Sequence, residues 1–177
     1  MFRTVNLVGI STVALGIAFL FVVTAPFAAA QKTLDEARQV AAYSLSMENV
    51  TRYLQTSAEV RKECKTDPDL ARRFQEYGST SHSLDESLAW FKATPKLVAA
   101  SKEHGISPHD MVLTQAAFLA AIQVGAALEN GTKEAPQDPD SQILWASVSR
   151  DHLKLLNDHA AEIAKLQAAL AQAPGDK

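Results

Sequence analysis

The stretch SPHDMVLTQAAFLAAIQVGAALE, residues 107–129, decides the fold of this chain. After its first turn, polar side chains occur at Thr114, Gln115 and Gln123 alone before the last residue, so a helix formed here is apolar on every side. Such a helix is buried, either in a protein core or in a membrane. We favour a protein core, because two glutamines interrupt the apolar surface and capped helical patterns surround it. Among the many alanines, Gly125 indicates a close approach by another helix.

The start of this stretch carries helix-capping signals. Gly105 follows a shorter helical pattern and predicts a left-handed residue at the C-terminal cap of that helix. Ser107 predicts the N-cap of the long helix, and Pro108 takes its first position, where the missing N–H costs no hydrogen bond. Asp110 completes a Ser-x-x-Asp capping box. The segment is therefore predicted to be a joint between two helices.

The rest of the chain repeats these signals. A capping residue precedes proline at Asp67-Pro68, Thr94-Pro95 and Asp138-Pro139, and each pair predicts the start of another helix. No segment alternates apolar and polar residues with a period of two, so no strand is predicted. We predict an all-α fold, a compact bundle of six or seven helices around a central Ala-rich apolar helix at about 108–129. The last helix is predicted as one continuous element at 149–171.

The first thirty residues have the pattern of a secretion signal. Arg3 is followed by about 19 uncharged residues, and Pro26 precedes the small residues Ala28-Ala29-Ala30. We predict that residues 1–30 are a signal peptide cleaved before Gln31. The apolar run is also just long enough to span a bilayer, so a retained anchor is the alternative. The protein is predicted to be periplasmic or secreted.

Cleavage would leave a chain of the size of one domain. We predict a short N-terminal helix or linker at 31–45, a single helical domain at 46–171 and a disordered tail at 172–177. No integral membrane segment is predicted after cleavage, because the long apolar helix is assigned to the core.

The charge balance restricts the partners. The chain has 17 basic and 20 acidic residues, and loss of the leader, whose single charged side chain is Arg3, changes the net charge from −3 to −4. No basic segment is available to neutralise phosphates, so neither nucleic acid nor an anionic membrane surface is a predicted partner. We expect an envelope protein or a small ligand instead.

Cys64 is the single cysteine, so the protein has no internal disulfide. An exported chain with one cysteine has either a free thiol or a disulfide to another molecule, so a dimer through Cys64 is one alternative. Cys64 falls close to the helical face of Ser57 and Val60, which indicates a small, partly buried core residue.

Two histidines near the C-terminus are the candidate site. On a continuous helix, His152 and His159 lie about 20° apart within the apolar stripe. In one interpretation they line a pocket for a small ligand, a metal or haem, with Gln115 or Gln123 as further inward polar groups. In the other they are core-edge residues that hydrogen-bond to a backbone carbonyl or to the next helix. We favour the second interpretation.

Motifs for other chemistries are absent from the sequence. It contains no HExxH, CxxC, CxxCH, GxSxG or glycine-rich phosphate loop. His104 and His109 flank the joint but belong to opposing helix ends, and two ligands do not complete a metal site. The second helix of the joint has no lysine or arginine to contact DNA. We predict no enzyme activity, no metal site and no cofactor.

Three stretches together resemble a group of small exported all-α bacterial proteins that has no assigned activity. They are MENVTRYLQTSAEV at 47–60, SLDESLAWFKATPKLVAASKEHGISPHDMVLTQAAFLAAI at 83–122 and SVSRDHLKLLNDHAAEIAKL at 147–166. Members of the group often carry an asparagine seven residues before a His-x-x-Glu/Asp-Ile pattern, and here His152 takes its place. The resemblance implies an exported helical domain and assigns no catalytic or binding residue.

The sequence therefore predicts an exported helical protein that serves as a non-catalytic binding or structural module of the cell envelope. The alternative is a small-ligand, metal or haem binder that uses inward-facing histidines of the last helix.

Overall fold

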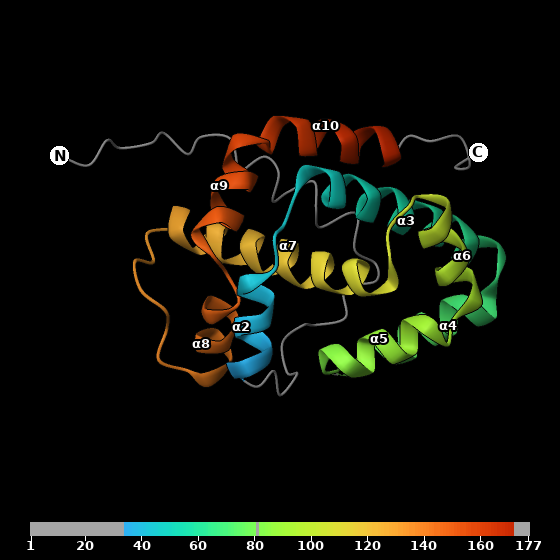
Figure 1. Cartoon of the computed structure of the whole chain (residues 1–177), viewed down its shortest axis with the longest axis horizontal. Coiled ribbons are helices and arrows are strands. Elements are labelled where there is room, and N and C mark those ends of the chain that lie inside the picture. The colour runs from blue at the N-terminus through green and yellow to red at the C-terminus, as the bar shows by residue number, and fades with distance from the viewer. Residues whose placement is uncertain (1–33, 81, 172–177) are drawn as a thin grey trace.

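The structure, a computed structural model, describes residues 34–80 and 82–171 (Figure 1). Within these ranges it has nine helices and no strand, which confirms the all-α prediction. The predicted signal peptide at 1–30 and tail at 172–177 lie outside the described residues. The helices are α2 (Leu34–Ala42), α3 (Met47–Thr66), α4 (Pro68–Gly78), α5 (Leu84–Lys92), α6 (Pro95–Glu103), α7 (Pro108–Glu129), α8 (Pro139–Ala146), α9 (Arg150–Asp158) and α10 (Ala160–Ala171).

The described helices exceed the predicted six or seven, in part because 149–171 forms two helices instead of one. The chain turns at His159, between α9 and α10, and Figure 1 shows these two helices running in different directions. α9 packs against α7, whereas α10 packs against α3. Asn157, Asp158 and His159 are weak helix formers, so the break falls where the helical propensity is low.

α7 is the central helix of the bundle. It packs against α2, α3, α5, α6, α8 and α9, which lie around it in Figure 1. Its buried residues include runs of consecutive positions between Met111 and Gly125, so they cover every side of the helix. Among the described helices, α7 has the length and composition of a membrane span, but more than half of its most apolar window is buried inside the bundle. The prediction of a central apolar helix at 108–129 is confirmed.

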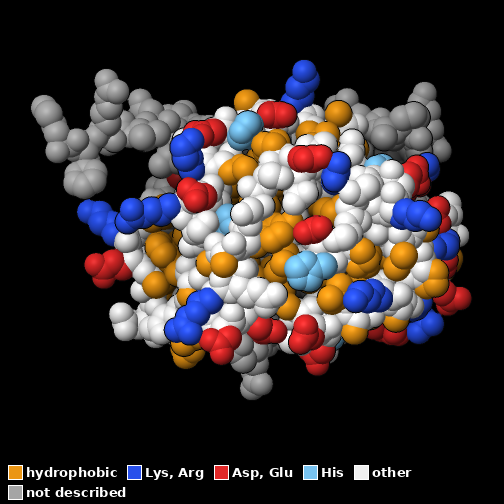
Figure 2. Space-filling view, viewed as in Figure 1, with side chains coloured by type: hydrophobic (Ala, Val, Ile, Leu, Met, Phe, Trp, Pro, Cys, Tyr) orange, Lys and Arg blue, Asp and Glu red, His pale blue; other side chains and the backbone are white. Residues whose placement is uncertain are grey.

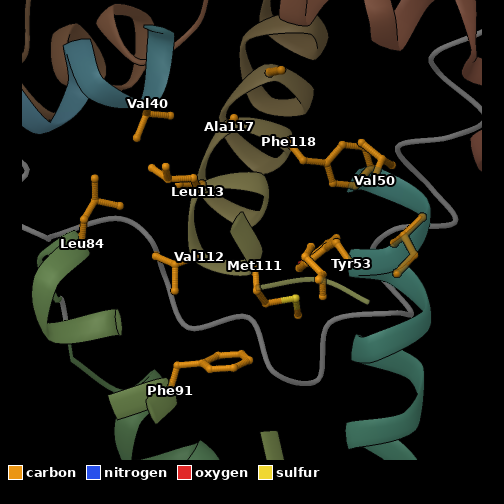
Figure 3. Close-up of a cluster of buried hydrophobic side chains, with 14 of the residues drawn as sticks. Val40, Val50, Tyr53, Leu84, Phe91, Met111, Val112, Leu113, Ala117 and Phe118 are labelled. Atoms are coloured by element: carbon orange, nitrogen blue, oxygen red, sulfur yellow. The ribbon is translucent and has the colours of Figure 1, made fainter. Parts of the chain in front are cut away.

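Aromatic and aliphatic side chains from both sides cover α7 (Figure 3). Phe118 of α7 is fully buried and meets Tyr53 of α3 edge to face, with ring centroids 6.0 Å apart. Val40, Leu84 and Phe91, from α2 and α5, approach α7 from another side. The described helices other than α8 therefore contribute side chains to one apolar core.

α2 belongs to this bundle. It is the described part of the segment 31–45, which was predicted as a short helix or a linker, and it packs against α7 and α8. Ala37 and Val40 on its inner side have no exposed surface. The carboxylate of Glu36 accepts a hydrogen bond from the backbone N–H of Leu84, at 3.0 Å, and so connects α2 to the start of α5.

Gly105 ends α6 as predicted. Its φ is +67°, a left-handed conformation that favours glycine. The N–H of Gly105 donates to the carbonyl of Lys102, and the N–H of Ile106 donates to that of Ser101. These two hydrogen bonds form a Schellman motif, whose hydrophobic residue, Ile106, is buried under the joint.

Ser107 and Pro108 begin α7 as predicted. The hydroxyl oxygen of Ser107 accepts from the N–H of Asp110 at 3.0 Å, and Pro108 is the first helical residue. The predicted reciprocal capping box is half formed. The carboxylate of Asp110 instead accepts hydrogen bonds from the Ser107 hydroxyl, at 2.6 Å, and from the hydroxyl of the neighbouring Tyr43, at 3.4 Å.

Acidic and basic side chains are mixed on the face seen in Figure 2, without an area of one sign. Several form ion pairs along one helix, such as Arg52 with Glu48 at 2.6 Å and Arg72 with Glu76 at 2.9 Å. Exposed pairs of this kind contribute little to stability, because solvent screens their charges. The stability of the fold therefore depends mainly on the packing around α7.

Two glycine substitutions are expected to have opposite effects on stability. A methyl group at Gly125 would lie 3.9 Å from Cδ2 of Leu153, an ordinary van der Waals distance, so Gly125→Ala should stabilise the protein by up to about 1 kcal/mol through helix propensity. Gly105→Ala would strain the left-handed residue and should destabilise by about 1–2 kcal/mol. Urea unfolding measures both changes, and a destabilised Gly125→Ala would show a closer contact between α7 and α9.

Candidate ligand-binding site

His152, the first predicted site residue, is a buried structural residue. Its side chain is 2% exposed, and its Nε2 lies 2.7 Å from the carbonyl oxygen of Tyr43. Because a carbonyl oxygen accepts, Nε2 carries the proton and donates it. Nδ1 then accepts from the backbone N–H of Ser149, the N-cap of α9, at 3.5 Å. Both ring nitrogens are used by backbone groups, which matches the favoured interpretation of a core histidine bonded to a carbonyl.

His159 does not share a wall with His152, and its expected inward orientation is wrong. Its side chain is 41% exposed, and its Nδ1 lies 2.9 Å from Oε2 of Glu162. The expectation assumed one helix at 149–171, and the break between α9 and α10 removes the common stripe on which the two histidines would lie. The site proposed from this pair is therefore not formed.

The two glutamines of α7 have different surroundings. Gln123 is exposed, so its expected inward position is wrong, whereas Gln115 is half-buried and lines a pocket. Eight residues separate them, which on a helix of 3.6 residues per turn leaves them about 80° apart around the axis. In the described part of the chain, no three His, Cys, Asp or Glu side chains are grouped so as to hold a metal ion.

Substitutions at the two histidines should separate their roles. His152→Leu keeps much of the side-chain volume but removes the acceptor of the Ser149 N–H and leaves the Tyr43 carbonyl with the Leu45 N–H alone, so it should destabilise the protein by about 1–3 kcal/mol. His159→Ala should change the free energy of unfolding by less than about 0.5 kcal/mol, since surface substitutions have small effects. Denaturant unfolding followed by circular dichroism measures both, and equal losses would contradict these roles.

The pocket that Gln115 lines is the strongest candidate site in the structure. It lies between α3, α4, α5, α6 and the first half of α7, and its volume is about 120 Å³. Helix α3 provides half of the lining residues, and the other four helices provide the rest. The lining residues are Tyr53, Leu54, Ser57, Val60, Arg61, Cys64, Phe74, Trp90, Phe91, Leu97, Met111 and Gln115.

Aromatic packing holds one wall of the pocket in place. The rings of Phe74 and Trp90 meet nearly at right angles, with centroids 4.9 Å apart. Trp90 also stacks on Tyr77, with ring centroids 4.1 Å apart. Tyr77 stacks in turn on His82, with ring centroids 3.8 Å apart. Tyr77 also donates a hydrogen bond to Ser87, at 2.8 Å. Trp90 is therefore fixed before any ligand arrives.

Small side chains on α3 leave the pocket open. Ser57 and Cys64, two small residues of α3, line the space on this side. Figure 3 shows Met111 and Phe91 lying close together, with Tyr53 beside Met111, at the edge of the core that borders the pocket. The pocket is thus an unfilled space that borders the hydrophobic core.

Few polar groups line the pocket, and one of them is charged. Burial raises the pKa of the Tyr53 phenol well above its usual value, so this group is neutral, and the nearby Ser57 and Arg61 oppose the shift. Burial also lowers the pKa of the Arg61 guanidinium, which is half-buried. Tyr53, Ser57 and Arg61 follow at intervals of four residues and therefore share one face of α3.

The thiol of Cys64 lies on the same wall and is protonated at neutral pH. Burial is the main cause that raises its pKa, and the charge of Asp67 raises it further. Lys96 opposes this shift, while its ammonium group bridges Glu63 at 2.6 Å and Asp67 at 3.0 Å. Cys64 is partly buried against the core, as predicted. A disulfide-linked dimer stays a prediction.

Sequence reasoning identified the inward face of α3 but not the pocket. Tyr53, Leu54, Val60 and Cys64 do face the core, as their helical spacing indicates. Arg61 was not identified, although its spacing of eight residues from Tyr53 is the signal that could have placed a cation on that inward face. The pocket itself has no sequence signal, because its other walls come from helices distant in the chain.

Comparisons of the chain with protein-family models, with curated proteins and with solved structures found no match. The function is therefore inferred from the chemistry of the pocket. Its residues form no group of acid, base and nucleophile, and its twelve lining residues include no Asp, Glu or His. The arrangement is suited to holding a small apolar body beside one cation.

Alkylation of Cys64 tests the position of the pocket wall. Iodoacetamide should react with this thiol several-fold more slowly than with free cysteine at mildly alkaline pH, because burial restricts access and the raised pKa lowers the thiolate fraction. Mass spectrometry follows the reaction without ambiguity, since the chain has one cysteine. Urea should restore the rate of a free thiol, and full reactivity in the folded protein would contradict this position.

Proposed function

We propose that this protein is an exported, non-catalytic binding module that holds a small apolar molecule in the pocket between α3 and α7. The observation that carries the proposal is the lining of the pocket, which is mostly apolar and aromatic around a few polar groups. Binding sites for small molecules have this composition, because apolar walls supply affinity while a few polar groups set orientation. Export rests on the leader pattern of residues 1–30.

The size of the pocket limits the ligand. An apolar cavity of about 150 Å³ in another protein binds benzene, and the volume here is about 120 Å³. The pocket therefore suits one aromatic ring or a short aliphatic chain. A haem, with four pyrrole rings, is far too large for this space.

The fixed aromatic wall supports binding over a purely structural role. Trp90 is held between Phe74 and Tyr77, so a ligand ring would meet a surface that is already ordered. A preformed site loses less conformational entropy when a ligand binds. The neutral Tyr53 phenol and the protonated Cys64 thiol have no neighbouring base in the lining, which supports binding instead of catalysis.

Binding of toluene, as a neutral probe, tests this proposal. With Trp145→Phe as the background, Trp90 is the remaining tryptophan, and its fluorescence should change on titration. We expect a dissociation constant on the order of 0.1–1 mM for so small a ligand. Toluene should also raise the midpoint of thermal unfolding.

Matched variants of the two glutamines provide the control. Gln115→Phe places a ring in the pocket and should weaken toluene binding by about tenfold or more. Gln123→Phe makes the same change at an exposed position of the same helix and should leave binding unchanged. Absence of a toluene signal in the parent protein, or equal loss in both variants, would refute the proposed site.

A further inference from the structure

We propose that the pocket selects small carboxylates with an apolar body, such as an arylacetate, over neutral molecules of the same shape, and that Arg61 binds the carboxylate. This inference rests on the proposed function, because it names the class of ligand that the same pocket takes. The apolar body would lie against Trp90 and the other aromatic side chains, and the charged end would lie beside the guanidinium group.

Arg61 lacks the carboxylate partner that three other arginines of the described residues have. Arg38, Arg52 and Arg72 each form an ion pair with a carboxylate one turn away on the same helix. Within residues 34–80 and 82–171, no carboxylate forms an ion pair with Arg61, although its side chain is half-buried. A guanidinium group matches a carboxylate in shape and can donate two parallel hydrogen bonds to it.

The charges around the pocket also favour an anion. None of the lining residues is acidic, so Arg61 leaves the lining with one net positive charge. The nearest acidic residues beside Cys64 are Glu63 and Asp67, and the ammonium group of Lys96 bridges both. A carboxylate ligand would therefore meet a cation without an acidic residue in the same wall.

The unpaired cation makes a carboxylate ligand favourable in free energy. Partial burial takes water from the guanidinium group and lowers its pKa, which is the direction expected for a cation without a compensating anion. A bound carboxylate would supply that anion in surroundings less polar than water, where the attraction is stronger. Gln115, whose amide forms no hydrogen bond with the described residues, provides a further donor in the lining.

The test compares phenylacetate with phenylacetamide, which have the same shape and differ in charge. In the parent protein, phenylacetate should bind about tenfold more tightly or better, the range expected for hydrogen bonds to a charged group. The preference should decrease with added salt, because the site is partly open to solvent. Calorimetry or the fluorescence of Trp90 measures both ligands.

Three variants assign the preference to Arg61. Arg61→Met keeps the long apolar stem and should make the two affinities nearly equal, with phenylacetamide binding retained. Arg61→Lys keeps the charge and should restore much of the preference for phenylacetate. Lys62→Met removes the same charge from the next residue of α3, which is exposed and does not line the pocket, and should leave the preference unchanged.

The outcomes separate the inference from the function on which it rests. If toluene and phenylacetamide bind but phenylacetate binds no more tightly, the carboxylate inference is wrong and the apolar pocket stands. If Lys62→Met reduces the preference as much as Arg61→Met does, general surface charge is the cause and Arg61 is not the anchor. If none of the three probes binds, both the inference and the proposed function are refuted.

Discussion

The burial of α7 on all sides is the constraint on which the rest of the structure depends. From Met111 to Ala121 the buried residues of α7 lie in every direction, so this part of the helix has no face to leave in water and other helices must surround it. No single neighbour covers such a helix, and six others pack against it. Short helices with well-capped ends are suited to surrounding α7, because each covers one part of it before the chain changes direction. The joint at Gly105, with its Schellman motif, is one such turn.

Tyr43 connects several of the surrounding helices. It lies just after α2, and its carbonyl accepts the hydrogen bond from His152 at the start of α9. Its hydroxyl lies 3.0 Å from that of Thr114 on α7 and accepts from the amide of Asn49 on α3 at 2.7 Å. One residue thus satisfies polar groups from three helices at the edge of the core. Groups this well paired define one arrangement of the helices, because a shift of any one would leave a donor or acceptor unpaired.

The pocket borders the same helix, but unlike the Tyr43 network it contains unfilled space and an unpaired charge. Thr114 and Gln115 are consecutive residues of α7 and point about 100° apart. The first is fully buried in the Tyr43 network, and the second faces a space that the protein does not fill. Around that space the aromatic side chains are already held by one another, and Arg61 has a charge but no carboxylate partner among the described residues. Apolar packing and a single cation therefore meet at one place, which is the basis for the proposed ligand class.

Local patterns in the sequence were sufficient for much of the fold. Ser107, Pro108 and Gly105 act within one or two turns of the chain, so their capping roles are predicted from their neighbours and confirmed in the structure. The apolar composition of 108–129 likewise predicts a central helix whatever its neighbours are. The candidate site was harder to predict. For His152 the favoured interpretation, a core-edge residue bonded to a backbone carbonyl or to the next helix, agrees with its hydrogen bond to Tyr43, but the inward positions of His159 and Gln123 were wrong.

The difference lies in the distance along the chain over which each interaction acts. The sequence by itself determined the helical class, the starts of helices and the central position of α7, because capping and helical periodicity depend on residues a few positions apart. Local propensity marks His159 as a weak point, but tertiary structure decided that the last segment breaks there, because α9 and α10 pack against different helices. It also decided that Arg61 borders a pocket, since Phe74, Trp90, Leu97 and Gln115 reach that place from four other helices.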